Sequence, residues 1–220
     1  MFGFFIMGFV DIVGVATSYV KADFTGMDDK VAGLISLSCF LWFLILSIPT
    51  GMLMNRIGRK KTVMISFALT ALAMLIPVLK YDFTFVLLAF AMLGIGNTIL
   101  QVALNPLVSN VVAPEKLTGT MTLGQFVKAI SSFLGPILAA MSAGSAFGWK
   151  AIFPVYALVT LMAMVWLALS PIEEQLVEKS EITFSRTFSL LKDKYIVLFF
   201  VGILVLVGVD VGMGVTFPKL

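Results

Sequence analysis

Apolar residues follow one another along this chain in seven long blocks, which short polar segments separate. The blocks cover residues 2–20, 31–53, 62–79, 83–109, 117–142, 151–169 and 195–217. A helix needs roughly 20 such residues to cross a bilayer. The strands of a β-barrel would be about half that length and would alternate in polarity. The pattern therefore predicts an all-α membrane protein embedded in a lipid bilayer.

Composition narrows the function. The 220 residues are 60% hydrophobic and 12% charged, which excludes an ordinary soluble domain. Cys39 is the single cysteine and there is no histidine, so the usual ligands of a metal site and the usual neutral-pH proton carrier are missing. We find no nucleotide-binding loop and no nucleophile beside a base. We therefore expect no enzyme, no cofactor and no metal.

The basic residues predict an orientation, because short cytoplasmic loops collect lysine and arginine. With residue 1 in the cytoplasm, the outside loops hold four basic residues: Lys21, Lys30, Lys80 and Lys150. The inside loops then hold nine: Arg56, Arg59, Lys60, Lys61, Lys116, Lys179, Arg186, Lys192 and Lys194. We expect a cytoplasmic amino end. The net charge of +3 follows from this topology, and we draw no nucleic-acid partner from it.

The chain has one clear internal break. Six blocks are joined by short loops, and then a polar segment precedes the seventh block, which echoes the first: "VDIVGVATSYVK" from Val10 and "VDVGMGVTFPK" from Val209. Such an echo suggests two six-helix halves related by an axis along the membrane normal. We expect a six-helix bundle over 1–170, a cytoplasmic linker over 171–194, and over 195–220 the first helix of a second, truncated bundle.

The loop after the second block carries a motif. "GMLMNRIGRKK", residues 51–61, resembles the signature of the major facilitator superfamily. The matching residues are Gly51, Arg56, Gly58, Arg59 and Lys60, while Asn55 stands where aspartate is usual. We expect Gly51 to let helices approach closely and Gly58 to permit a tight turn. The arginines can cap helix carboxyl ends and stabilise one transport conformation.

Two further stretches, "GNTILQVALNPLVSNVVAPE" and "LGQFVKAISSFLGP", are similar to the fucose:proton symporter family and its bacterial hexose-transporter relatives. The resemblance implies proton symport of a hexose-like sugar by alternating access, in a bacterial inner membrane, by a protein that is monomeric at full length. In that family an aspartate on the first helix and a glutamate on the fourth are associated with sugar binding and proton coupling. Asp11 matches the aspartate. Gln101 stands at the glutamate position and Lys128 at a family asparagine.

Helical spacing brings the same residues together, independently of the family resemblance. Polar side chains recur about four residues apart on two blocks: Asn97, Gln101, Asn105 and Ser109, then Thr118, Thr122, Gln125 and Ser132 with Lys128 at the edge. Polar groups within lipid must face the bundle interior or water, so the stripes predict a wet central cavity. At 1.5 Å per residue, Asp11, Gln101 and Lys128 each lie roughly 15 Å deep, near the middle of the core.

Lys128 needs an explanation, because a lone charge at this depth costs at least ~3 kcal/mol. Asp11 is the nearest candidate partner in depth, and Asp210 lies slightly higher on the seventh block. A structural ion pair is one interpretation. In the functional one, Asp11 loses its lysine when it is protonated or when a sugar hydroxyl intervenes, which couples proton movement to the conformational change. Lys128 could instead bind an anionic substrate such as a sugar acid.

We therefore expect a secondary active transporter of a small sugar, with a proton or sodium as the coupling ion. Asp11 and Lys128 are the candidate coupling residues, and the candidate substrate-binding residues are Asn97, Gln101, Asn105, Gln125 and Asp210. Export of drugs or another polar solute, and a non-transporting membrane sensor, are the alternatives. Two structural expectations complete the picture: an interfacial position for Trp149, and close helix packing at Gly94, Gly96, Gly124 and Gly135.

Overall fold

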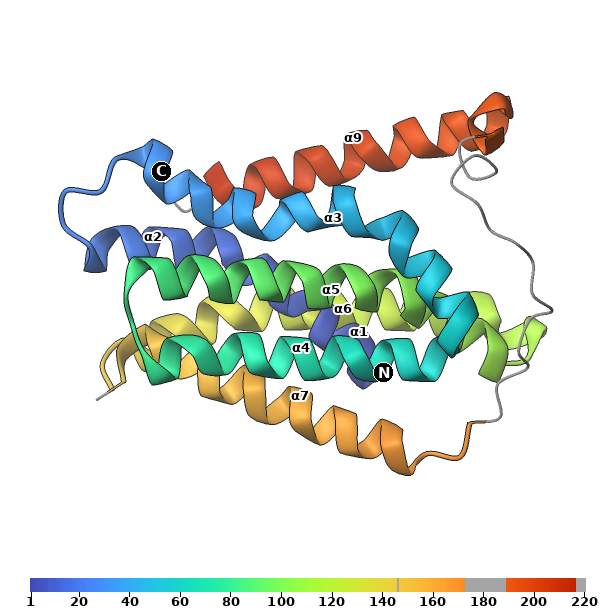
Figure 1. The fold of residues 1–220 in the computed structure, drawn as a ribbon, viewed down its shortest axis with the longest axis horizontal. Coiled ribbons are helices and arrows are strands. Elements are labelled where there is room, and N and C mark those ends of the chain that lie inside the picture. The colour runs from blue at the N-terminus through green and yellow to red at the C-terminus, as the bar shows by residue number, and fades with distance from the viewer. Residues whose placement is uncertain (146, 173–188, 217–220) are drawn as a thin grey trace.

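The regular elements in the described part of the chain are helices. The computed structural model describes residues 1–145, 147–172 and 189–216, without the side chains of 210, 211 and 214–216. Within these ranges the elements are α1 (Phe2–Met7), η1 (Gly8–Ile12), α2 (Val13–Asp23), α3 (Asp29–Ile57), α4 (Arg59–Leu79), α5 (Phe83–Val111), α6 (Pro114–Ser142), η2 (Gly148–Ala151), α7 (Ile152–Leu169), η3 (Leu190–Lys192) and α9 (Lys194–Thr216), as Figure 1 shows.

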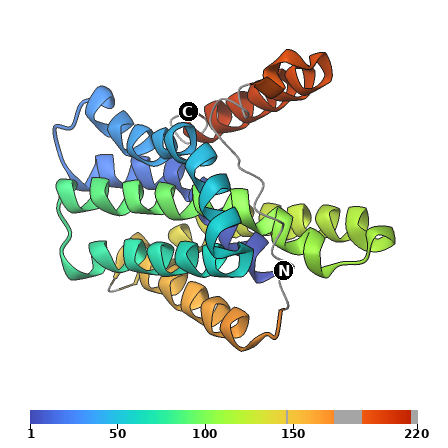
Figure 2. The same cartoon turned by 45° about the vertical axis from the view of Figure 1, so that its right-hand side comes forward.

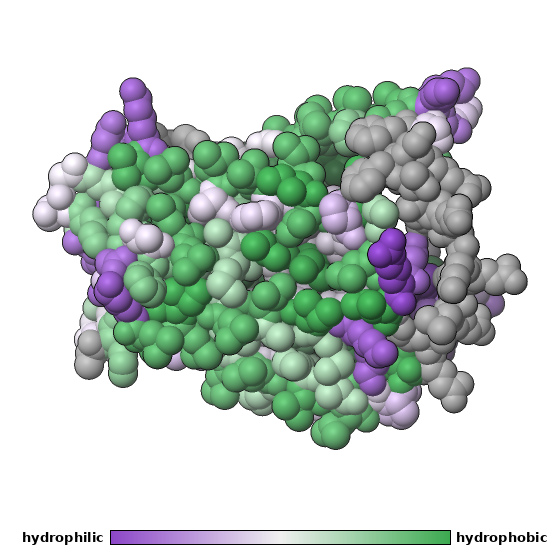
Figure 3. All heavy atoms as spheres, viewed as in Figure 1, coloured by the Kyte–Doolittle hydropathy of each residue, from purple (hydrophilic) through white to green (hydrophobic). Residues whose placement is uncertain are grey.

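Six segments of the described chain are long and apolar enough to cross a membrane: Phe2–Asp23, Asp29–Ile57, Arg59–Leu79, Phe83–Val111, Pro114–Ser142 and Gly148–Leu169. A shorter apolar stretch, Lys194–Val209, belongs to α9. In the face drawn in Figure 3, hydrophobic residues occupy the middle of the molecule and the strongly hydrophilic ones gather toward its two ends. The structure thus confirms the predicted all-α class, and the protein is an integral membrane protein.

The helices run back and forth between two ends of the bundle (Figures 1 and 2). The amino end holds Met1, the turn at Gly58 and the end of α7. The far end holds the loops at 24–28 and 80–82 and residues 143–145 and 147. At the far end, Asp82 caps α5 by accepting a hydrogen bond from the Phe85 amide at 3.0 Å.

The connection between α3 and α4 is a single residue. α3 ends at Ile57, α4 begins at Arg59, and Gly58 between them has φ 93° and ψ 160°. This backbone region is accessible mainly to glycine, because a Cβ would clash with the neighbouring peptide groups. The Gly58 carbonyl then accepts hydrogen bonds from the backbone amide of Thr62, at 3.2 Å, and from its hydroxyl, at 2.7 Å. Two long helices therefore depend on one glycine to reverse direction.

Gly58→Ala is expected to lower the free energy of unfolding by about 1–3 kcal/mol, the usual cost of a strained backbone conformation. Thermal unfolding in detergent measures the change. Gly144→Ala is the matched control, because Gly144 has no positive φ and no heavy atom of the described residues lies within 4 Å of the position of its added Cβ. Equal melting temperatures for the two variants would contradict the strain at Gly58.

Glycines allow the helices of the bundle to touch. α5 packs against both α3 and α4, and α6 packs against α1 and η1. A Cβ added at Gly96 would lie 2.6 Å from the Thr70 hydroxyl of α4, and one added at Gly124 would lie 2.5 Å from the Phe4 ring of α1. A Cβ added at Gly135 would lie 2.6 Å from the Tyr156 hydroxyl, and one added at Gly94 would overlap the Cys39 carbonyl oxygen. The structure therefore confirms close packing at all four glycines.

Gly51 does not make the close helix contact that the loop motif predicts. In the described chain no heavy atom lies within 4 Å of a Cβ built there. The reason is that little of the α3 surface is covered by other helices of this bundle. Of the apolar segment of α3, 17% is buried, against 56% for that of α5. A packing role for Gly51 is therefore wrong for this arrangement of the described helices.

Three parts of the chain meet at the far end in what we call the Asp23 cluster: Asp23, Tyr81, Trp149 and Lys150. The Asp23 carboxylate accepts hydrogen bonds from the Tyr81 hydroxyl at 2.6 Å and from the Trp149 indole at 3.0 Å, and Lys150 lies 3.9 Å away. Trp149 also stacks on Tyr19. Trp149 is only 5% exposed, so its indole contacts the protein, and the predicted interfacial position stays a prediction. The indole is enclosed because its N–H bonds to Asp23, Tyr19 stacks on it and Phe153 packs against it at a tilt.

Tyr81→Phe is expected to lower the unfolding free energy by about 1 kcal/mol, because the Asp23 carboxylate loses one donor. Burial raises the pKa of the Tyr81 hydroxyl and the hydrogen bond to Asp23 raises it further, so the group remains a donor through the range near pH 10 where tyrosine normally ionises. Thermal melts at neutral pH measure the loss. Tyr195→Phe, at an exposed tyrosine of α9, should leave the melting temperature unchanged.

The seventh helix lies against one side of the bundle. α9 contacts α2, and its large apolar side chains between Tyr195 and Val209 are exposed. Most of the predicted linker 171–194 falls outside the described residues, and the division into two halves stays a prediction.

Candidate functional site

The first membrane span is interrupted in its middle. α1 gives way at Gly8 to the 3-10 turn η1, and α2 resumes at Val13. The apolar pattern of residues 2–20 predicts one continuous span and contains no signal for this change. A 3-10 stretch inside a helix often marks a hinge, and discontinuous membrane helices commonly form transporter sites. Asp11, a candidate coupling residue, lies within η1 and is half-buried.

The polar stripe of α5 reaches this interruption. Asn97 is fully buried, and its Nδ2 donates to the Met7 carbonyl at 3.2 Å, immediately before η1. Gln101 Nε2 donates in turn to Asn97 Oδ1 at 2.8 Å. Both ends of the Asn97 amide are therefore engaged by the protein. In this conformation Asn97 holds the first span in place, while the half-buried Gln101 is the more accessible of the two.

The polar stripe of α6 reaches the same segment from another side. The Ser132 hydroxyl hydrogen-bonds to Oδ2 of Asp11. Directly beside it, η1 and α6 touch through their backbones: a Cβ added at Gly8 would lie 2.7 Å from the Lys128 carbonyl oxygen and 2.7 Å from the Ser131 Cβ. η1 is thus held between α5 and α6 by side chains of the two predicted stripes.

Ser132 lies between Asp11 and Lys128: its hydroxyl contacts the Asp11 carboxylate and the Lys128 backbone carbonyl. Both residues are half-buried, and the ion pairs of the described residues include none between them. Ser132 contacts the carboxylate instead. The sequence places Ser132 in the α6 stripe but does not distinguish it from the other hydroxyl residues there. Lys128 is the charged residue of that stripe and is therefore the more obvious partner for Asp11. A spacing of four residues from Lys128 is the one signal that could have found it.

The other candidate residues occupy different positions. In the described structure the enclosed Oδ1 of Asn105 has no hydrogen-bond partner, and such an atom has unused capacity for a hydroxyl or a water. Gln125 is exposed on α6. Asp210 lies on α9, and its side chain is outside the described part of the structure.

The loop-motif residues tie helix ends together at the amino end. Arg59 Nη1 donates to the Pro106 carbonyl near the end of α5 at 3.1 Å. Lys60 Nζ donates to the carbonyls of Ser170, at 2.7 Å, and Ala168, at 3.3 Å, at the end of α7. Cations are favourable at these termini because the helix dipole leaves partial negative charge there. Arg56 is exposed and Asn55 is half-buried.

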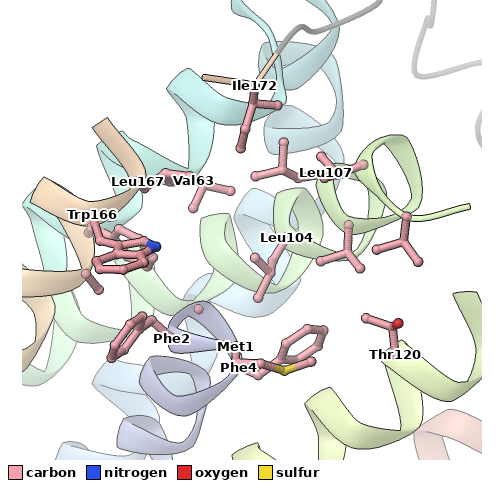
Figure 4. Close-up of a pocket in the computed structure, with 16 residues that line it drawn as sticks. Met1, Phe2, Phe4, Val63, Leu104, Leu107, Thr120, Trp166, Leu167 and Ile172 are labelled. Atoms are coloured by element: carbon pink, nitrogen blue, oxygen red, sulfur yellow. The ribbon is translucent and has the colours of Figure 1, made fainter. Parts of the chain in front are cut away.

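A cavity of about 240 Å³ opens at the amino end of the bundle (Figure 4). Its lining comes from α1, α4, α5, α6 and α7 and is apolar except for Thr120; Phe2, Leu104 and Trp166 project into it. None of the predicted coupling or sugar-binding residues lines it. This cavity suits an apolar group, whereas the polar contacts around η1 suit a hydroxylated one.

Comparisons with known proteins agree with this anatomy. Residues 1–219 match the Major Facilitator Superfamily. Two curated proteins, each named "Glucose/galactose transporter", from Brucella abortus biovar 1 (strain 9-941) and Brucella abortus (strain 2308), are each 28% identical to the chain over 226 residues. Each alignment covers 96% of this chain and 54% of the relative. The chain thus spans about half the length of these relatives.

Proposed function

Since this chain belongs to the major facilitator superfamily, whose members are transporters and not enzymes, we propose that it forms part of a carrier for a small, hexose-like sugar. The observation that supports this most is the similarity to the two glucose/galactose transporters along nearly the whole chain. The activity is proposed for the complete gene product, because alternating access needs two bundles that face each other across one site.

The substrate contacts we propose come from amide side chains. Gln101, Asn105 and Gln125 each offer donors and acceptors that suit sugar hydroxyls, and Asn105 has an enclosed oxygen that no described group satisfies. We propose that Asn97 does not contact the sugar but orients Gln101 by accepting its hydrogen bond. A hydroxylated solute would lie beside η1, where the first span is irregular.

We propose that the protein is a proton symporter and that Asp11 binds the proton that moves with the sugar. The carboxylate lies in the 3-10 turn and contacts α6 through Ser132, so a change of its charge acts at a junction of two spans. Lys128 lies one turn before Ser132 on the same face of α6. We propose that its ammonium approaches Asp11 in another state of the transport cycle and thereby tunes proton uptake.

The loop motif and the topology complete the proposal. Arg59 and Lys60 join α4 to the ends of α5 and α7, contacts that would stabilise one transport conformation. The excess of basic residues at the amino end favours its placement in the cytoplasm, and relatives of bacterial origin favour a bacterial inner membrane.

Uptake by membrane vesicles tests this function. Vesicles from cells that express the complete gene would be loaded at alkaline pH, diluted into acidic buffer, and supplied with labelled glucose or galactose. We expect accumulation that collapses with a protonophore, and exchange of labelled for unlabelled sugar without a gradient. A sodium gradient and a labelled sugar acid form two further arms. Neither exchange nor accumulation of any hexose would refute the sugar function, and binding without exchange would indicate a sensor.

The amino-end cavity favours one second candidate, export of an apolar solute. Its lining offers little to a sugar but fits a lipophilic molecule of a few rings. Efflux of lipophilic dyes from cells that express the complete gene tests this function. Filling the cavity with Leu104→Trp should then slow dye efflux and leave sugar exchange unchanged.

A further inference from the structure

One hydroxyl at the junction of η1 and α6 has two acceptors. Ser132 Oγ contacts Oδ2 of Asp11 on η1, and it lies 3.0 Å from the backbone carbonyl oxygen of Lys128, one turn earlier on its own helix. A serine hydroxyl carries one proton and two lone pairs. It can therefore donate fully to one of these oxygens at a time, and it can accept a hydrogen bond while it donates.

We propose that Ser132 is a positioning residue that passes the protonation state of Asp11 to α6. This inference rests on the proposed proton-coupled function. When the carboxylate is ionised, the Ser132 hydroxyl donates to Oδ2 and links α6 to η1. When a proton from water occupies the carboxyl group, the hydrogen bond reverses: the carboxyl O–H donates to Ser132 Oγ, and the Ser132 proton turns to the Lys128 carbonyl. Every donor keeps an acceptor in both states, and only the proton from water is added.

The second acceptor lies where the two backbones touch. The Lys128 carbonyl oxygen is the atom that a Cβ at Gly8 would meet at 2.7 Å, so η1 rests directly on it. A serine that bonds to the carbonyl four residues earlier tends to bend its helix. Protonation of Asp11 would therefore weaken the link between η1 and α6, because a charge-assisted hydrogen bond becomes a neutral one. It would also favour a bend of α6 at the same contact.

Three other titratable groups lie around Asp11, and none of them takes the place of the hydrogen bond to Ser132. Tyr156 on α7 and Cys39 on α3 interact electrostatically with its carboxylate, and Lys128 lies on α6 one turn before Ser132. Tyrosine and cysteine are ordinarily neutral at neutral pH and lysine is ordinarily charged. In the described structure, none of the three is hydrogen-bonded to the carboxylate, whereas Ser132 is.

Two variants of equal shape isolate the hydroxyl. Ser132→Thr retains the donor, and Ser132→Val has the same branched outline without it. In vesicles with the complete gene product, sugar exchange without a gradient and accumulation under a pH gradient are measured for each. We expect Ser132→Thr to keep both. Ser132→Val should keep exchange within about twofold but accumulate about tenfold less sugar, which corresponds to ~1.4 kcal/mol.

The control is Ser47→Ala on α3. Ser47 is also half-buried, and its hydroxyl bonds to the Phe43 carbonyl four residues earlier, with no carboxylate involved. It should keep both activities. If branching at this position prevents folding, Ser132→Ala gives the same comparison against the unsubstituted protein. Accumulation by the hydroxyl-free variants at the unsubstituted level would overturn the relay, and so would an equal loss of exchange and accumulation. Absence of exchange in the unsubstituted protein would refute the proposed function instead.

Discussion

Asp11→Asn is expected to abolish accumulation of sugar against its gradient while exchange of sugar across the membrane continues. Asparagine has the shape of aspartate and offers an oxygen to the Ser132 hydroxyl, so the contact between η1 and α6 can persist. Its amide does not titrate between pH 5 and 8, so it cannot carry a proton. A difference of one pH unit stores about 1.4 kcal/mol per proton, which supports about tenfold accumulation by a one-to-one symporter. The variant should equilibrate labelled galactose at a ratio of about one.

Asp28→Asn provides the comparison for this experiment. Asp28 is exposed, precedes α3, and makes no side-chain hydrogen bond to cap it, so the same change of charge occurs away from the span interior. Its accumulation ratio should equal that of the unsubstituted protein. Normal accumulation by Asp11→Asn would exclude this carboxylate as the proton carrier. Accumulation that responds to sodium and not to pH would replace the proton with sodium.

Gly94→Ala is expected to cause the largest loss of stability. A Cβ at Gly94 would overlap the carbonyl oxygen of Cys39 and lie 2.8 Å from its carbonyl carbon. The obstacle is the backbone of α3, which cannot rotate away as a side chain could. Overpacking typically costs ~1–3 kcal/mol, and sometimes more, and here relief requires two long helices to separate. We expect a cost at or above the upper end of that range.

The measurement is the fraction of monodisperse protein that remains after heating in detergent. Gly33→Ala is the control: Gly33 is also within a helix of the same contacting pair, and within the described structure no heavy atom lies within 4 Å of its added Cβ. That control should be neutral or slightly stabilising, since alanine favours helix over glycine by up to ~1 kcal/mol. If both variants melt together, the contact between α3 and α5 is less tight than the structure indicates.

The sequence predicts the helices well because each depends on a long, local property. The predicted block 83–109 becomes Phe83–Val111, and 62–79 becomes Arg59–Leu79. Gly58 was also predictable, since a glycine between two apolar blocks has little purpose other than a tight turn. The break at Gly8 was not, because five residues of 3-10 helix leave the hydrophobic pattern unchanged and result from contacts with α5 and α6.

The meeting of the two polar stripes with the first span was predictable, and the hydrogen-bond pairs between them were not. Both polar stripes do meet the first span, as the spacing of Asn97 and Ser132 implies. The rotation of each helix and its depth in the bundle decide which atoms form hydrogen bonds. Residue spacing determines neither the rotation nor the depth. Charge alone favours a pair between Asp11 and Lys128. The structure instead places a hydroxyl on the carboxylate, while the backbone of Lys128 supports Gly8.

The Asp23 cluster bears on how the molecule is assembled during synthesis. Asp23 emerges early from the ribosome, but its two hydrogen-bond donors lie 58 and 126 residues later in the chain. We therefore expect the carboxylate to gain its second donor, and the far end to close, only after the third hairpin has been inserted. A nascent chain that stops before Trp149 should leave that end open to protease. Formation of the hydrogen bond from Trp149 to Asp23 would thus report that the earlier helices have been inserted correctly.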